Sequence, residues 1–468
     1  MLKLTPYLLL IGLIGTLVAG CATSPATSPT PTTASPTMSA PTAAAPTPES
    51  APTSTAAAEQ LVDRFAQQDY AALLASFNAA MQAALPEEKL QQAWTGITQQ
   101  FGAFQGRTSS KFITRKDPYD VIVVTAQFEK SALGFRVSVD TTNGQIGGLQ
   151  FVPAETTQTP YTVPAYVDQT KFEERDVTIG TGEWQLPGTL TLPKGTGPFP
   201  AVVLVHGSGP NDRDETVGPN RPFKDLAWGL ASQGIAVLRY DKRTKVYGEQ
   251  IAAMTVFTTK EETVDDAALA ADVLRQTPNI DPQRVFVLGH SLGGYLAPRI
   301  AQANANLAGL IIVAGLTRPL EDTMLEQYQY IASVDKNAVP AEVLTALPAQ
   351  VQAIKDLQPG DESKPPILGA PAAYWLYLKD YRPTEVAKAV TKPMFILQGE
   401  RDYQVTMVDF KNWQTALADR SDVQFKSYAD LNHLLLSGRG PSTPQEYQQA
   451  GSVATAVIDD IAAWVKGH

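Results

Sequence analysis

A serine lies at the centre of a glycine-flanked pentapeptide, residues 289–293 (Gly-His-Ser-Leu-Gly). The apolar run 285–288 (Val-Phe-Val-Leu) precedes it, and a helical apolar pattern follows from Tyr295. A strand, a tight glycine turn and a helix in this order form a nucleophile elbow, which holds a serine hydroxyl above a sheet. Glycine is needed because a β-carbon would clash in so sharp a turn. The pattern therefore predicts that Ser291 is the nucleophile of a covalent hydrolytic reaction.

A serine hydroxyl becomes a competent nucleophile when a neighbouring base takes its proton. The chain has four histidines. His206 opens a Gly-Ser-Gly loop after an apolar strand, His290 adjoins the serine and should point away from its hydroxyl, and His468 is the last residue. His433 lies in a loop after the predicted strand 423–428 and before the last helix. By elimination, we predict that His433 is the general base.

The base needs a carboxylate that fixes its tautomer and stabilises its charged form. In the chain order serine, acid, histidine, this carboxylate lies between the other two residues. Asp402 follows the predicted strand 394–397 and is expected close to His433. We therefore predict that Asp402 is the triad acid. Glu400 is the alternative, and Asp409 is expected on the next helix.

Acyl transfer also requires two backbone N–H donors for the oxyanion that forms on the substrate. The amide of Leu292, directly after the nucleophile and at a helix start, is predicted as the first donor. The second should come from the loop after His206. Ser208 is the preferred residue, with Gly207 and Gly209 as alternatives.

Short, continuously apolar strands alternate with helical patterns from about residue 166 onward, as in a parallel sheet covered on both faces. Mostly helical patterns rich in tyrosine interrupt this alternation and predict a cap over about 316–391. The aromatic residues of this cap fit an apolar or sugar-lined pocket and ordinary core packing equally well. The expected elements are a hairpin at 177–192, strands at 201–205, 235–240, 285–288, 310–313, 394–397 and 423–428, and helices at 223–233, 264–276, 291–304 and 453–465.

Residues 166–468 resemble the α/β-hydrolases, near the bacterial branch of dienelactone hydrolases, acyl-peptide peptidases and acetyl esterases. The resemblance implies an α/β fold with a mostly parallel sheet, and an esterase that forms an acyl-enzyme on Ser291. True dienelactone hydrolases use cysteine at the elbow, so that activity is not implied. Residues 211–214 are expected to organise the loop around the site or to form a surface ion network. The resemblance is carried by residues 206–214, 238–243, 289–293 and 399–402 and by His433.

Two other interpretations stay open: a serine peptidase or aminopeptidase with the same triad, and a non-catalytic surface binding protein that kept the fold. The expected partner is a small-molecule ester. The formal net charge is −10 without a basic block, which argues against a nucleic acid partner. No metal or other cofactor is expected, because the histidines lack metal-ligand spacing and dinucleotide fingerprints are absent.

The first residues have the pattern of a secretory signal. Lys3 precedes an apolar stretch at 7–18, which is shorter than the roughly 20 residues needed to span a bilayer. The run 17–21 (Leu-Val-Ala-Gly-Cys) resembles a bacterial lipobox. We therefore expect a signal peptide at 1–20 and lipid on Cys21, which would place the protein outside the cytoplasm and anchor it to a membrane. An ordinary signal peptide with an incidental cysteine is the alternative.

Two further segments precede the hydrolase-like part. Residues 21–56 are almost entirely Pro, Thr, Ser and Ala after the cysteine, which predicts a disordered tether. Residues 57–153 are predicted to form a small α+β domain, with helical patterns at 57–100 and strands at 121–128, 135–139 and 146–152. This part resembles a small domain of unknown function that often precedes bacterial hydrolases, and no catalytic constellation is found in it.

Overall fold

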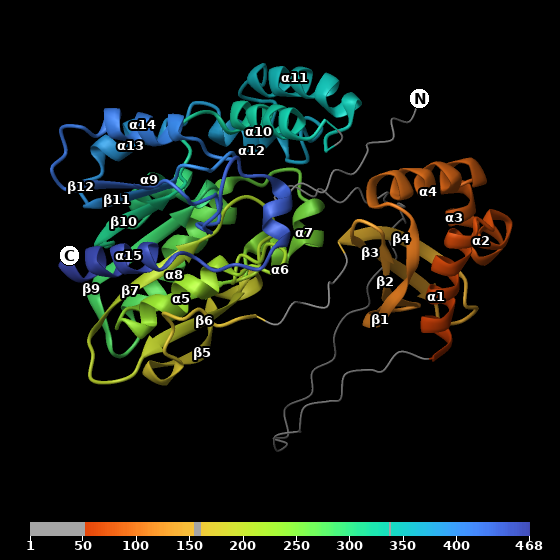
Figure 1. Ribbon diagram of the computed structural model, residues 1–468, viewed down its shortest axis with the longest axis horizontal. Helices are drawn as coiled ribbons and strands as arrows, with labels where there is room; N and C mark the ends of the chain where they lie inside the picture. Colours follow the sequence, from red (N-terminus) through yellow and green to blue (C-terminus); the bar gives the residue numbers. More distant parts are fainter. Residues whose placement is uncertain (1–51, 154–160, 337) are drawn as a thin grey trace, which may run out of the picture. The chain divides into compact units, whose positions relative to one another are not determined.

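The computed structural model describes residues 52–153, 161–336 and 338–468, which form two units that divide near residue 160 (Figure 1). The predicted signal peptide 1–20, Cys21 and most of the predicted tether 21–56 lie outside the described residues. No helix in the described part of the chain has the length and apolarity that a membrane span requires.

The smaller unit consists of helices that pack on an antiparallel sheet. Its helices are α1 (Pro52–Gln67), α2 (Tyr70–Ser76), α3 (Ala79–Ala84) and α4 (Glu87–Phe101). Its strands β1 (Phe104–Lys116), β2 (Tyr119–Phe128), β3 (Ala132–Asp140) and β4 (Ile146–Pro153) pair in chain order. Aromatic side chains fill the core between the two layers, with Phe65 against Trp94 and Phe135.

Two features of this unit differ from the sequence-based expectation. Helix α1 starts at Pro52, earlier than the predicted boundary at 57, and proline is well suited to a first helical position. Strand β1 was not predicted. It alternates between half-buried and exposed side chains without an apolar face, and its pairing with β2 holds it in the sheet.

The larger unit is built on an eight-stranded sheet in the order β12-β11-β10-β9-β7-β8-β6-β5. Strands β7 to β12 run parallel, and β6 is antiparallel to both of its neighbours, β5 and β8. This topology confirms the predicted α/β-hydrolase fold. The strands are β5 (Phe172–Ile179), β6 (Leu186–Pro193), β7 (Phe199–Val205), β8 (Ala236–Tyr240), β9 (Ile280–His290), β10 (Gly309–Val313), β11 (Met394–Gly399) and β12 (Val423–Tyr428).

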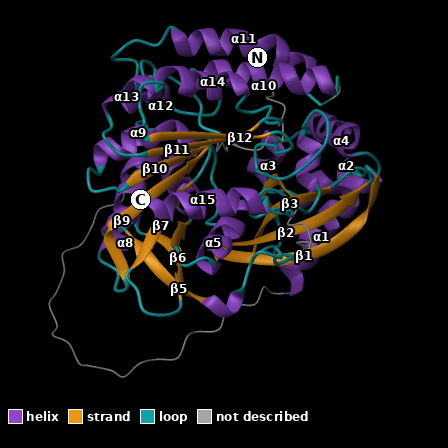
Figure 2. Cartoon of the chain, turned by 60° about the vertical axis from the view of Figure 1, so that its left-hand side comes forward, coloured by secondary structure: helices purple, strands orange, loops and turns teal. Residues whose placement is uncertain are grey.

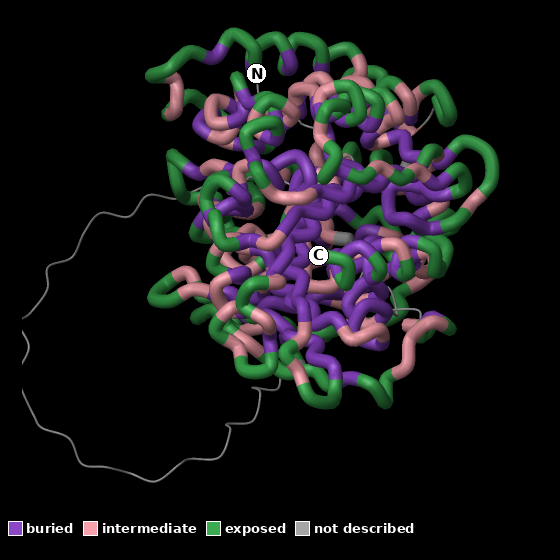
Figure 3. The backbone as a smooth tube through the Cα atoms, turned by 90° about the vertical axis from the view of Figure 1, so that its left-hand side faces the viewer, coloured by how far each residue is buried: buried purple, intermediate pink, exposed green. Residues whose placement is uncertain are grey.

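Helices cover both faces of this sheet, which explains why the inner strands β8, β10 and β11 are buried along their whole length. Figure 2 shows the strands between two helical layers, and Figure 3 shows the buried residues gathered in the interior and the exposed ones around it. Helices α5 (Pro222–Ser232) and α15 (Thr455–Gly467) pack together, and so do α8 (Asp266–Arg275) and α9 (Leu292–Ala303). Outside the insertion between β10 and β11, the remaining helices are α6 (Arg243–Val246), α7 (Gly248–Ala252), α14 (Met407–Ala416) and a π-helical turn at Lys260–Asp265. Short 3-10 turns lie at Gln169–Lys171, Gly182–Trp184 and Pro444–Gln448.

The insertion between β10 and β11 is helical, with α10 (Leu320–Val334), α11 (Ala341–Lys355), α12 (Ala372–Leu378) and α13 (Pro383–Ala389). Two of its aromatic residues, Trp375 and Tyr381, belong to the main hydrophobic core. Tyr330 instead stacks on Tyr403, in the loop after β11, with ring centroids 5.1 Å apart. The insertion therefore reaches the edge of the sheet at which the parallel strands end.

Candidate active site

Ser291 lies between the end of β9 and the start of α9, in a tight turn that requires glycine at positions 289 and 293. Its φ of 53° and ψ of −113° are rare for a residue with a side chain. A β-carbon on Gly289 would lie 2.2 Å from the carbonyl oxygen of Gly293, and one on Gly293 would lie 2.3 Å from that of Val205. The elbow is thus packed against itself and against the end of β7.

Asp402 and His433 are in direct contact. His433 Nδ1 lies 2.7 Å from Asp402 Oδ2, and the carboxylate is completely buried. Its other oxygen, Oδ1, accepts hydrogen bonds from the amides of Gln404 (2.7 Å) and Val405 (3.0 Å). The side-chain nitrogen of Gln398, Nε2, donates to Oδ2 at 3.2 Å. These donors fix the carboxylate, which in turn orients the imidazole.

The alternative acids are engaged elsewhere. Glu400 is exposed and accepts a hydrogen bond from the Ser427 hydroxyl at 2.7 Å. Asp409 lies on α14, as expected, and its buried carboxylate forms an ion pair with Arg318 at 2.8 Å. Of the three acids considered from the sequence, Asp402 is the one in contact with His433.

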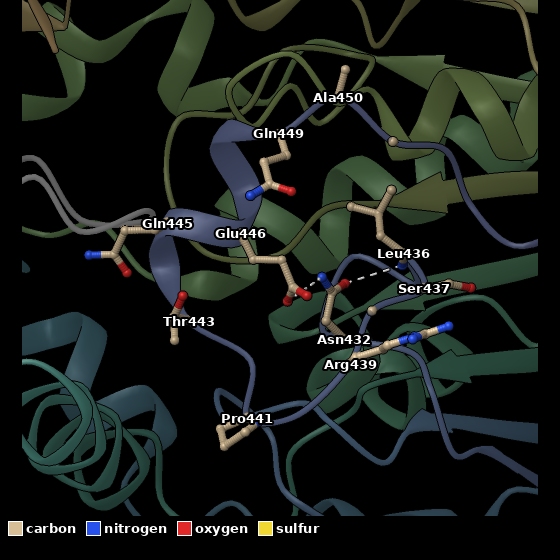
Figure 4. Close-up of a pocket in the computed structure, with 12 residues that line it drawn as sticks. Asn432, Leu436, Ser437, Arg439, Pro441, Thr443, Gln445, Glu446, Gln449 and Ala450 are labelled. Atoms are coloured by element: carbon tan, nitrogen blue, oxygen red, sulfur yellow. Dashed lines mark hydrogen bonds between the residues drawn. The ribbon is translucent and has the colours of Figure 1, made fainter. Parts of the chain in front are cut away.

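Asn432, which the sequence analysis did not single out, shapes the loop that carries His433. Its side-chain oxygen accepts hydrogen bonds from the amides of Leu434 and Leu436, and its nitrogen donates to Glu446 at 3.0 Å. Figure 4 shows this side chain at a polar cavity of about 430 Å³. Ser291, Asp402 and His433 are not among the residues that line this cavity. No sequence spacing marks Asn432, because its partners are set by the loop conformation.

A second imidazole–carboxylate contact, between His290 and Glu215, lies beside the first. His290 Nδ1 lies 2.8 Å from Glu215 Oε2, and His290 Nε2 donates to the His433 carbonyl at 2.9 Å. Burial lowers the pKa of His290, but the Glu215 carboxylate outweighs it and the net shift is upward. Burial raises the pKa of Glu215, yet His290 and the Gly207 amide bring it below its usual value. Both side chains therefore favour their charged forms.

The loop after β7 lies against the nucleophile. A β-carbon on Gly207 would be 3.1 Å from Ser291 Cβ. The Gly207 amide donates to Glu215 Oε1 at 2.6 Å, so it is not available to a substrate, and Gly207 is removed from the candidate oxyanion donors. Asn211 donates to the carbonyls of Gly207 and Ser208 and braces the loop from the other side.

His206 and residues 211–214 organise this loop. The pKa of His206 is lowered to about 4 by burial, and its Nε2 donates to the Asp212 carbonyl at 3.0 Å. Arg213 pairs with Asp241 at 2.9 Å, and Asp214 pairs with Arg239. Residues 211–214 thus take part both in hydrogen bonds within the loop and in ion pairs with Arg239 and Asp241. In the described part of the chain, no cluster of three or more His, Cys, Asp or Glu residues is arranged to hold a metal ion.

The comparisons with known proteins agree with this architecture. A family model described as serine aminopeptidase, S33, matches residues 198–439, and one described as a protein of unknown function (DUF3887) matches 58–149. Esterase EstD of Thermotoga maritima is 40% identical over 404 residues, which cover 86% of this chain and 93% of the relative.

Solved structures also match the chain. The α/β-hydrolase GrgF from Penicillium sp. sh18 is 16% identical with a TM-score of 0.43, covering 63% of this chain and 99% of its own. The acylaminoacyl peptidase of Pyrococcus horikoshii is 14% identical with a TM-score of 0.42, covering 77% and 55%. Since the serine aminopeptidase model spans more than half of the residues and a relative aligns over most of the length, the chain belongs to the serine aminopeptidase S33 family of α/β-hydrolases.

Proposed function

We propose that the chain is a serine carboxylic ester hydrolase that forms an acyl-enzyme on Ser291, with His433 as general base and Asp402 as its orienting acid. The observation that carries the proposal is the 2.7 Å contact between His433 Nδ1 and Asp402 Oδ2. When Nδ1 donates to the carboxylate, the lone pair of Nε2 is free to accept the serine proton. The esterase relative from Thermotoga maritima supports an ester as the substrate.

In the proposed reaction, Ser291 Oγ attacks the ester carbonyl while its proton moves to His433 Nε2. The bond to the alcohol then breaks, the alcohol takes this proton, and the acyl group stays on Ser291. Water, deprotonated by His433, attacks the acyl-enzyme, and the acid leaves as Ser291 regains a proton. The same imidazole thus acts as base and then as acid in both halves of the reaction.

The oxyanion would be held by the amides of Leu292 and Ser208. Leu292 is the first residue of α9, so its N–H has no acceptor within the helix. Among the described residues, no acceptor is hydrogen-bonded to the Ser208 amide. The Gly209 amide is the alternative second donor, since that of Gly207 is bound to Glu215.

A panel of aryl esters that vary in acyl length tests the proposal, with wild type and Ser291→Ala measured side by side. We expect rapid turnover of short-chain esters by wild type and a loss on the order of a millionfold in the variant. A serine peptidase or aminopeptidase is the second candidate, favoured by the description of the matched family. Faster turnover of an aminoacyl arylamide than of the best ester would replace the esterase with this candidate.

We further propose that Cys21 carries lipid after removal of residues 1–20, and that residues from 22 onward tether the enzyme to an extracytoplasmic membrane surface. The support is the run Leu-Val-Ala-Gly-Cys at 17–21 and the composition that follows it. Wild type should sediment with membranes and enter a detergent phase, whereas Cys21→Ser should not carry lipid. A wild-type protein without lipid mass on Cys21 would contradict this proposal.

A further inference from the structure

We infer that Glu215 and His290 form a positioning pair that holds the oxyanion loop, the nucleophile elbow and the loop of the base in register. This inference rests on the proposed function, because it assigns a role relative to Ser291 and His433. Neither residue of the pair is proposed to touch the substrate.

Three connections from the pair carry the inference. Glu215 Oε1 accepts from the Gly207 amide at 2.6 Å, and the next residue along is Ser208, the proposed oxyanion donor. His290 directly precedes Ser291 in the elbow. His290 Nε2 donates to the backbone carbonyl of His433 at 2.9 Å. One buried pair therefore links the three segments whose relative positions decide the chemistry.

Burial and backbone conformation indicate that Glu215 and His290 serve to position the neighbouring segments and not to stabilise the fold. Glu215 and His290 are 3% and 6% exposed, and buried ion pairs contribute little net stability compared with apolar residues of similar size. Glu215 also has a φ of 49°, which is unfavourable for a residue with a side chain. A strained residue that bears a buried charge is typical of a site at which geometry matters more than stability.

The carbonyl of Gly207 is held as firmly as its amide. Lys242 Nζ donates to this carbonyl at 2.8 Å, and Lys242 is itself paired with buried Glu262 at 3.3 Å. The Gly207 carbonyl shares a peptide unit with the Ser208 amide, so its contacts with Lys242 and Asn211 restrict the rotation of that unit. The Gly207 amide, held by Glu215, restricts the preceding peptide unit. The Ser208 amide can then point in a fixed direction.

Replacing Glu215 tests the inference through turnover rather than stability. Glu215→Ala should lower kcat by about 100-fold with KM within about threefold, since loss of one oxyanion donor costs about 10²–10³ in kcat. Glu215→Gln keeps an oxygen for the Gly207 amide and offers an N–H to His290 Nδ1, so it should recover kcat to within about tenfold of wild type. Affinity for a trifluoromethyl ketone, which forms an oxyanion on Ser291, should fall in parallel with kcat/KM.

Asp225→Asn is the matched control, because it changes a buried carboxylate that hydrogen-bonds Tyr161 and Val453 instead. This variant should change the thermal midpoint but leave kcat and inhibitor affinity unchanged. If Glu215→Ala fails to fold, Glu215→Asp, which keeps the charge but shortens the reach, should lower kcat by about tenfold. Unchanged kcat in the folded variant would overturn the inference.

The test separates failure of the pair from failure of the proposed function. Wild type is first titrated with a fluorophosphonate, and each kcat is expressed per labelled site. Absence of the label on Ser291 in wild type would contradict both the proposed function and the inference. Full labelling with unchanged kcat in Glu215→Ala would sink the inference alone. Non-additive losses in Glu215→Ala and His290→Ala, with the double variant no worse than the poorer single one, would support a single unit.

Discussion

The two imidazole–carboxylate pairs at the end of the sheet differ in what the second ring nitrogen contacts. Their imidazole centroids lie 4.6 Å apart. His290 uses one nitrogen for Glu215 and the other for the His433 carbonyl. His433 uses Nδ1 for Asp402, and its Nε2 has no hydrogen-bond partner within the described ranges. An imidazole paired with a carboxylate therefore suits the role of a base in one pair and of a positioning contact in the other.

The two carboxylates differ in their support as well. Asp402 accepts two backbone amides on the oxygen that does not face its imidazole. Glu215 accepts one, from Gly207, which lies eight residues earlier in the same loop between β7 and α5. Asp402 is thus fixed by its own turn and orients His433, whereas Glu215 fixes its own loop and joins it to the nucleophile elbow through His290. The comparison predicts a large loss of kcat when Asp402 or His433 is replaced, and a smaller loss when Glu215 or His290 is replaced.

The most severe test of the comparison removes each imidazole in turn. His433→Ala should reduce kcat on an aryl ester on the order of a millionfold, because the base is lost, whereas His290→Ala should cost far less. Single-turnover kinetics on folded, titrated protein measures both. A larger loss for His290→Ala than for His433→Ala would reverse the two assignments.

The acids give the next largest effect. Asp402→Asn should lower kcat by about 10⁴-fold, because the amide favours the wrong imidazole tautomer, while the fold is kept. Glu400→Gln serves as the control and should have wild-type kcat, since Glu400 is exposed and bound to Ser427. If Glu400→Gln were the inactive variant, the acid would be Glu400.

Asp225 is a buried carboxylate that, unlike Asp402 and Glu215, has no imidazole partner among the described residues. Its effect is expected on the free energy of unfolding and not on catalysis. Burial raises the pKa of Asp225 from 3.8 to about 6. Between these values the native state binds more protons than the unfolded state, so stability falls as pH rises from about 4 to about 6. Asp225→Asn removes this dependence. The free-energy difference between wild type and variant, from urea unfolding, should shift by about 2 kcal/mol between pH 4 and 7. A constant difference would contradict the raised pKa of the buried Asp225 carboxyl.

The smallest effect concerns the space at Gly207, between Ser291 and Glu215. Gly207→Ala places a β-carbon 3.1 Å from Ser291 Cβ and 3.3 Å from Glu215 Oε1, so the neighbours must move by a few tenths of an ångström. We expect about a tenfold loss in kcat from this displacement. Gly248→Ala, where a β-carbon meets open space, should behave as wild type. Equal kcat in both variants would mean that the loop tolerates displacement.

The sequence predicted those parts of the site that depend on local pattern. The elbow around Ser291, the loop after β11 with Asp402 and the loop after β12 with His433 each follow a strand of the sheet, and the parallel strands bring their ends to one edge. The fold class followed from the same alternation. Asp402 was preferred to Glu400 by placement alone, and the structure shows the contact that distinguishes them.

The features that the sequence did not reveal depend on tertiary contacts or on pairing. Glu215 and His290 are 75 residues apart, and no spacing indicates that they meet. Asn432 forms its hydrogen bonds within an irregular loop. Strand β1 lacks an apolar face and is defined by its neighbour β2. In each case the contact forms only in the folded chain and leaves no local pattern in the sequence.

The most direct test of the central claim is the location of a covalent fluorophosphonate adduct, mapped by peptide mass spectrometry on folded wild-type protein. We predict a single adduct on Ser291, formed rapidly in wild type and in Glu400→Gln and much more slowly in His433→Ala. An adduct on another serine, or none on folded protein, would contradict Ser291 as the nucleophile activated by His433 and Asp402.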